Sequence, residues 1–193
     1  MTRRLDLYPS KKLRNPGRHL RQLARWPEWI AGDLAALGAR DPEAHFGGRF
    51  VNFKVPVFQK LVDPPHATLH AQLACLSAIF GAAQAVEKSD KRPANCRVAC
   101  LVSTPSLFNS EVTVFFDEDY FRSFLPREEG KRNYFDDGWI EDEPVEADAL
   151  GPLRMEAPEG MEFFGGTLLR QYDPAWGRKP VEQVTWVWAY PRR

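Results

Sequence analysis

The stretch from Leu69 to about Lys88 constrains the fold more than any other part of the chain. Its large apolar residues fall at spacings of four, three, four and three, which places them on one stripe of an α-helix. The members of this stripe are Leu69, Leu73, Leu76, Phe80 and Ala83. The other positions are mostly Ala, Gln and Ser, so we expect a helix that is nearly enclosed in a core. Its apolar part is shorter than the roughly 20 residues of a membrane span, and we expect no membrane contact.

Several strand-like segments follow one another without helices between them, which favours an antiparallel sheet. Alternating and β-branched runs predict strands at residues 50–58, 96–102, 111–116, 163–171 and 183–190. Capping residues and apolar spacing predict helices at residues 16–25, 27–38, 69–88 and 118–125. Residues 126–162 are expected to form a long irregular loop, followed by the terminal strand pair of residues 163–193. The sequence therefore predicts a single α+β domain over residues 1–193, an antiparallel sheet with helices packed mainly on one face.

One hydrophobic core is expected between this sheet and the long helix. A chain of 193 residues can bury such a core without disulfides or metals to hold it. The expected core members are Val51, Phe53, Val55, Leu73, Leu76, Phe80, Val98, Val112, Val114, Trp186 and Trp188.

The cysteines give a weak indication of the compartment. Cys75, Cys96 and Cys100 are odd in number and form no disulfide framework, which favours a reducing environment. Cys96 and Cys100 share a strand face with Val98 and Val102, so both are expected to pack as small apolar groups. Because the basic N-terminus is followed by no apolar run, we expect no secretory signal and a cytoplasmic location.

The 26 basic and 26 acidic side chains cancel, but their distribution along the chain is uneven. Residues 1–40 hold nine bases against three acids, whereas residues 111–162 hold five bases against sixteen acids. The basic N-terminal segment suits the polar side of a helix. We do not expect nucleic-acid binding, because the acidic segment would repel phosphate.

The most acidic part of the chain also carries aromatic residues. Two interpretations stay open: a solvated loop, or a surface that attracts a basic protein partner. An aromatic side chain among acids has the composition of an interface anchor, which favours the second interpretation. The candidate partner-binding residues are Tyr134, Asp136, Asp137, Trp139, Glu141, Asp142 and Glu143.

Motifs for catalysis are weak. His66 and His70 are four residues apart near Asp63 and could face one metal, with Asp117 and Asp119 as further acids. Asp117 is equally suited to cap a helix. His66 and His70 are equally consistent with two exposed side chains in the first turn of a helix, with no metal bound. The paired glycines lack the spacing of a phosphate-binding loop, and no nucleophile elbow is present. We therefore expect no cofactor, no metal and no catalytic residues.

Three segments together resemble a bacterial domain family of unknown function. They are KKLRNPGRHLRQL at residues 11–23, FVNFKVPVFQKLVDPP at residues 50–65 and ACLVSTPSLFNSEVTVFFDEDYF at residues 99–121, so the resemblance spans about residues 11–125. The resemblance implies a bacterial source and a neighbourhood of polymorphic-toxin genes. On this basis we expect a non-enzymatic binding protein, most concretely an immunity protein. Its acidic, aromatic-bearing surface would cover the active site of a cognate toxin whose cleft is basic. An enzyme with a metal-assisted site at His66, His70, Asp117 and Asp119 is the alternative, and a regulatory or scaffolding protein is a third.

Overall fold

The fold is that of a computed structural model, which describes residues 15–37, 48–125, 133–135, 138–172 and 181–193. Its centre is a seven-stranded sheet of order β1-β3-β2-β7-β6-β5-β4, in which every neighbouring pair is antiparallel. The strands are β1 (Phe50–Lys54), β2 (Arg97–Thr104), β3 (Glu111–Phe115), β4 (Asn133–Phe135), β5 (Gly138–Val145), β6 (Glu162–Tyr172) and β7 (Val181–Ala189). This arrangement confirms the predicted α+β class and antiparallel sheet.

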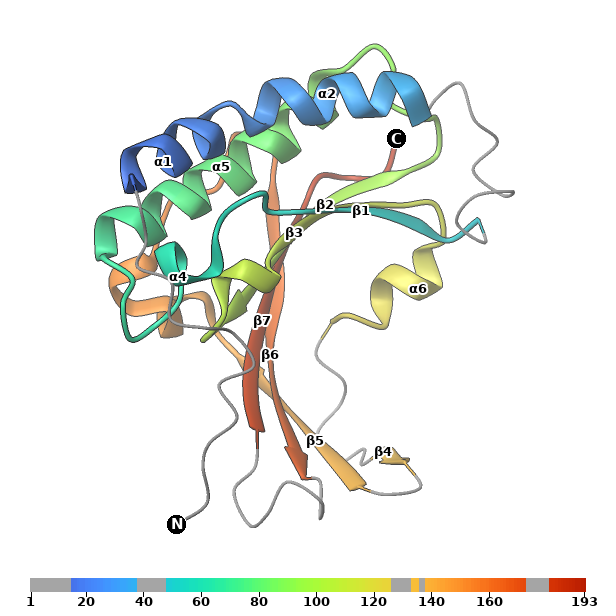
Figure 1. The fold of residues 1–193 in the computed structure, drawn as a ribbon. Coiled ribbons are helices and arrows are strands. Elements are labelled where there is room, and N and C mark those ends of the chain that lie inside the picture. Colours follow the sequence, from blue (N-terminus) through green and yellow to red (C-terminus); the bar gives the residue numbers. More distant parts are fainter. Residues whose placement is uncertain (1–14, 38–47, 126–132, 136–137, 173–180) are drawn as a thin grey trace.

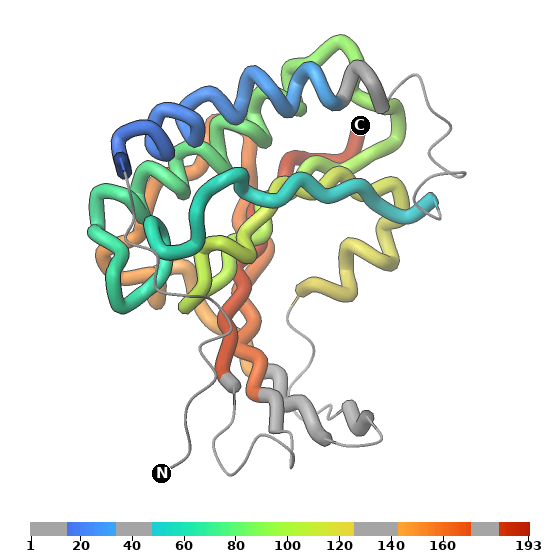
Figure 2. Tube along the Cα trace, in the orientation of Figure 1, coloured from blue at the N-terminus to red at the C-terminus, as the bar shows by residue number. Residues whose placement is uncertain are grey.

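Three helices cover one face of the sheet, with α1 and α2 lying along α5 (Figures 1 and 2). They are α1 (Pro16–Ala24), α2 (Trp26–Leu37) and α5 (Leu69–Lys88). The side chain of Asn15 accepts a hydrogen bond from the Arg18 amide, which confirms the expected cap of α1. The side chain of Thr68 accepts one from the Ala71 amide at the start of α5. Shorter turns at α4 (Gln59–Val62), η1 (Leu107–Asn109) and η2 (Ala147–Leu153) complete this layer.

The buried face of α5 is shifted from the predicted stripe. Leu76, Phe80 and Ala83 are buried as expected, but Leu69 is 48% exposed and Leu73 is only half-buried. The rest of the buried face consists largely of small side chains, which let neighbouring elements approach α5 closely: Ala71, Cys75, Ala78 and Ala82. A Cβ added to Gly81, for example, would lie 3.2 Å from Cγ of Pro27 in α2.

Length and composition make α5 the one helix among the described residues that would also suit a membrane span. Half of the stretch concerned is buried inside the fold, and the core helix of a soluble protein passes the same test. The pattern is therefore weak evidence for a membrane.

The main core lies between this helical layer and the sheet. It contains eight of the expected residues: Val55, Leu76, Phe80, Val98, Val112, Val114, Trp186 and Trp188. Phe53 packs against it, whereas Val51 is buried outside it. Phe80 meets Trp188 edge to face with ring centroids 5.5 Å apart, which joins α5 to β7 at the centre of the core.

The opposite face of the sheet is covered by α6 (Glu118–Arg122), seen below β1 and β3 in Figure 1. Phe121 of α6 is buried against a second, smaller cluster that includes Leu101, Phe115 and Val187. The side chain of Asp117 accepts a hydrogen bond from the Tyr120 amide at 3.0 Å, so Asp117 is the helix cap that the sequence offered as an alternative to a metal ligand.

The predicted irregular loop over residues 126–162 is wrong for most of its described part. Residues 133–135 form β4 and residues 138–145 form β5, which is paired with β6 along its length from Trp139 to Val145. Acidic residues are depleted in strands, so local composition favoured a loop. Pairing with the eleven-residue β6 overrides that local preference. The strand predicted over residues 50–58 is shorter than expected, ending at Lys54, two residues before Pro56.

Candidate functional site

The acidic segment forms part of an extension of the sheet that we call the acidic arm. It consists of β5 (Gly138–Val145) with the paired stretches of β6 (residues 166–172) and β7 (residues 181–186). In Figure 1 the far end of this arm, where β5 and β4 lie, projects beyond the helical layer. The candidate positions that the structure describes therefore lie on paired strands rather than in a loop.

Strand register divides the candidate residues between the two faces of the arm. Trp139 is the cross-strand partner of both Tyr134 in β4 and Tyr172 in β6. Residues two apart on a strand share a face, so the positions of Glu141 and Glu143 belong to the same face as that of Trp139. The position of Asp142 belongs to the other face. Asp136 and Asp137 lie outside the described residues.

Three charged side chains in the described part of the arm form a ladder across three strands. Arg170 in β6 donates from Nε to Oε1 of Glu182 in β7 at 3.0 Å, and its Nη1 pairs with Glu143 in β5. Both glutamates are about half exposed, so the ladder orders charges at the surface and contributes little to stability. Because one cation stands between two acids, the described ladder keeps a net negative charge.

The alternative metal set is not brought together by the fold. His66 and His70 are exposed, and Asp117 caps α6 on the opposite face of the sheet from α5. Asp63 is buried but already accepts hydrogen bonds from Ser106 Oγ at 2.5 Å and from the Phe108 amide at 3.2 Å. In the part of the chain that the structure describes, no three His, Cys, Asp or Glu side chains are placed to hold a metal ion.

A row of polar side chains on the α6 face of the sheet was missed from the sequence. At one end, Glu111 is 8% exposed, pairs with Lys54 and accepts a hydrogen bond from Asn52 Nδ2 at 3.1 Å. At the other end, the hydroxyls of Ser103 and Thr185 lie 3.2 Å apart. The signal was present, because these residues alternate with core residues such as Val112 and Trp186 along their strands. Alternation indicates a non-core face, but it does not show that polar residues of separate strands form one row.

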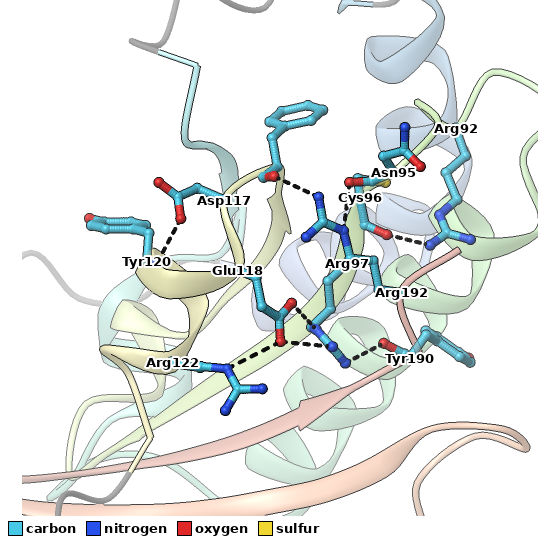
Figure 3. Close-up of polar contacts among 11 residues, drawn as sticks. Arg92, Asn95, Cys96, Arg97, Asp117, Glu118, Tyr120, Arg122, Tyr190 and Arg192 are labelled. Carbon is cyan, nitrogen blue, oxygen red and sulfur yellow. Dashed lines mark hydrogen bonds and ion pairs between the residues drawn. The ribbon is translucent and has the colours of Figure 1, made fainter.

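A second group of polar contacts fixes α6 to the sheet (Figure 3). Arg97 in β2 makes a paired contact with the carboxylate of Glu118, at 3.1 Å from Nε and 3.0 Å from Nη2. Its guanidinium packs over the rings of both Phe121 and Phe164, at 4.6 and 5.2 Å from their centroids. A guanidinium that is already paired and stacked has little capacity left for a ligand, so we assign this group a structural role.

All three cysteines are buried, as the strand pattern predicted for Cys96 and Cys100. Burial raises the pKa of the Cys75 thiol to about 12 and also raises those of Cys96 and Cys100. A protonated thiol is a poor nucleophile, so the described structure offers no activated cysteine.

No curated protein and no solved structure matches the chain. One family model does match, over residues 33–189. The resemblance seen in the sequence spanned about residues 11–125. The family match therefore starts later than that resemblance and includes the acidic segment, which the resemblance did not. The description of the family names no activity and no partner. Since the match covers most of the chain, the protein belongs to the family described as "Protein of unknown function (DUF3916)".

Proposed function

We propose that this chain is a non-enzymatic protein-binding domain that uses the acidic arm to bind a basic partner. The observation that carries the proposal is the register of β4, β5 and β6. It assigns two aromatic positions of the predicted surface, Tyr134 and Trp139, and two of its acids, Glu141 and Glu143, to one face of the arm. Aromatic anchors surrounded by charge of one sign are typical of surfaces that bind proteins of opposite charge.

The concrete form of the proposal is an immunity protein that acts in the bacterial cytoplasm. A toxin that cleaves nucleic acid needs a basic cleft for phosphate, and a row of carboxylates can occupy that cleft in place of its substrate. The ground for this form is the sequence resemblance, which implies a neighbourhood of polymorphic-toxin genes. The metal-enzyme alternative at His66, His70, Asp117 and Asp119 has no comparable observation in its favour.

The experiment that tests the proposal is a rescue assay with the gene next to this one in its genome. Expression of that gene alone is expected to arrest growth of a host bacterium, and co-expression of this chain to restore it. Reversal of Asp136, Asp137, Glu141 and Asp142 to Lys should slow association of the purified proteins and remove its salt dependence. The variant Trp139→Ala should weaken binding by about 2 kcal/mol, mainly through faster dissociation.

The arm offers a matched pair of single charge reversals. Glu141→Lys and Asp142→Lys change the net charge equally at neighbouring positions that belong to opposite faces. The proposal expects Glu141→Lys to impair rescue and Asp142→Lys to leave it intact. Equal effects of the two variants would mean that net charge, and not this face, attracts the partner. A neighbouring gene that is harmless would refute the immunity function. A rescue that survives the fourfold reversal would refute the role of the acidic arm in it.

A further inference from the structure

A cavity of about 300 Å³ lies where the end of α5 meets the residues that follow β7. It stands apart from the acidic arm and has no role in the function proposed above. Its volume is at the lower end of the range of small-molecule sites. The charged and polar residues in its wall are Glu87, Lys88, Glu159, Tyr190 and Arg193.

A buried ion pair forms the base of this cavity. Glu87 is 7% exposed, and the side chain of Arg92, exposed to 6%, donates from Nη1 to Glu87 Oε1 at 3.1 Å. Arg92 also donates from Nη2 to the Cys96 carbonyl oxygen at 2.7 Å, as Figure 3 shows. Arg193 approaches Glu87 Oε1 from the exposed side, with its Nη2 at 2.8 Å. The carboxylate of Glu87 is thus paired with two arginines at the inner end of the cavity.

The buried polar atoms that lack a partner are concentrated here. Four such side-chain atoms occur in the described part of the chain, and two of them belong to residues of the cavity wall. They are the hydroxyl of Tyr190 and Oε2 of Glu87, which forms an ion pair with Arg92 Nη1 at 3.1 Å but accepts no hydrogen bond. Tyr190 itself is only 4% exposed. Buried polar groups are nearly always hydrogen-bonded, so a local shortage of partners indicates that a bound molecule supplies them.

The charges in the cavity wall indicate what kind of molecule this is. Glu87 and Glu159 supply two carboxylates, and Lys88 and Arg193 supply two cations. An inorganic anion would bring no donor to the carboxylates, and a simple amine would bring no acceptor to Lys88. A molecule that carries both charges matches both halves of the wall.

We propose that this cavity binds a free α-amino acid. Its ammonium group is held by Glu87 and the Tyr190 hydroxyl, and its carboxylate by Lys88 and Arg193. The hydroxyl acts as a neutral hydrogen-bonding group, since burial raises the pKa of Tyr190 to about 12.

Calorimetric titration of the full chain with each of the standard L-amino acids tests the proposal. At least one is expected to bind, whereas acetate and methylamine at the same concentration are not. Tyr190→Phe removes only the hydroxyl and should weaken binding up to about tenfold, the effect of one lost hydrogen bond. Lys88→Ala should weaken it similarly. Lys91→Ala removes an exposed cation outside the cavity wall and should leave binding unchanged.

Three results would overturn the proposal: no amino acid binds, acetate binds as well as the best amino acid, or both cavity variants bind like the wild type. If Tyr190→Phe does not fold, Lys88→Ala decides alone, because the Lys88 side chain is exposed. The rescue assay for the arm does not depend on any of these residues, so the two proposals can fail separately.

Discussion

Gly166 should be one of the least replaceable residues in the sheet. It lies in β6 opposite Val145 of β5 and Trp186 of β7, at the base of the acidic arm. A Cβ added to Gly166 would lie 2.5 Å from the carbonyl oxygen of Val145 and 2.8 Å from Cδ1 of Trp186. Neither neighbour can move freely, because one is backbone and the other is a buried indole that donates from Nε1 to the Glu146 carbonyl oxygen at 3.2 Å.

The variant Gly166→Ala should therefore destabilise the protein by overpacking. Forcing a methyl group into a packed site typically costs about 1–3 kcal/mol. The clash of the added methyl group can be relieved only if β5 or the indole of Trp186 shifts. We therefore expect a loss in the free energy of unfolding at the upper end of this range, about 3 kcal/mol. For a chain of this length such a loss lowers Tm by roughly 6–12 °C.

Thermal and urea unfolding followed by circular dichroism would measure this effect. Gly32→Ala is the matched control, since a Cβ added to Gly32 in α2 meets nothing within 4 Å. In an exposed helix interior that change should stabilise by roughly 0.5–1 kcal/mol. A Gly166→Ala protein as stable as the wild type would show that β5 does not approach β6 in the way described, and the register of the acidic arm would lose its basis.

Three further predictions concern the core, the α6 contact and alkaline pH. Phe80→Ala should lower the free energy of unfolding in urea by about 3–5 kcal/mol, because it removes a buried ring packed on Trp188; a loss below about 1 kcal/mol would contradict the core assignment. Glu118→Gln should lower the free energy of unfolding by about 1–3 kcal/mol, because the paired Arg97 side chain is only 12% exposed. As a control, Glu28→Gln in the exposed pair with Arg25 should change the free energy of unfolding by less than about 0.5 kcal/mol. Tyr190 has its pKa raised from 10.0 to about 12 by burial, so the unfolded chain releases this proton first and stability should fall between these pH values; a Tyr190→Phe protein with the same alkaline decline would refute this assignment.

The helices and the central strands could be predicted because their signals are local. Asn15 before Pro16 marks a helix start from the chemistry of capping alone, and the structure has the cap. Val112 and Val114 alternate with polar residues, and the structure buries both in the main core. Neither prediction required knowledge of any distant segment.

The acidic strand and the cavity could not be predicted because their causes are not local. In β5 the acids and Pro144 argue against a strand, and only the partner residues in β6 make extended pairing favourable. The cavity joins Glu87, at the end of α5, to Tyr190, more than a hundred residues later in the sequence. From the sequence Glu87 is one of the final residues of a helix, where a charged side chain is ordinarily solvated.

The difference between a strand and a loop changes how the acidic segment can bind. In a loop each carboxylate would sample many directions, and ordering the backbone on binding would oppose association. In β5 the backbone is already held by pairing to β6, and residues on one face repeat about every 7 Å. A basic partner with cations at that spacing would meet Glu141 and Glu143 without reorganising the strand. Single reversals at Glu141 and Asp142 therefore compare positions on opposite faces of one paired strand, which removal of the whole acidic run would not do.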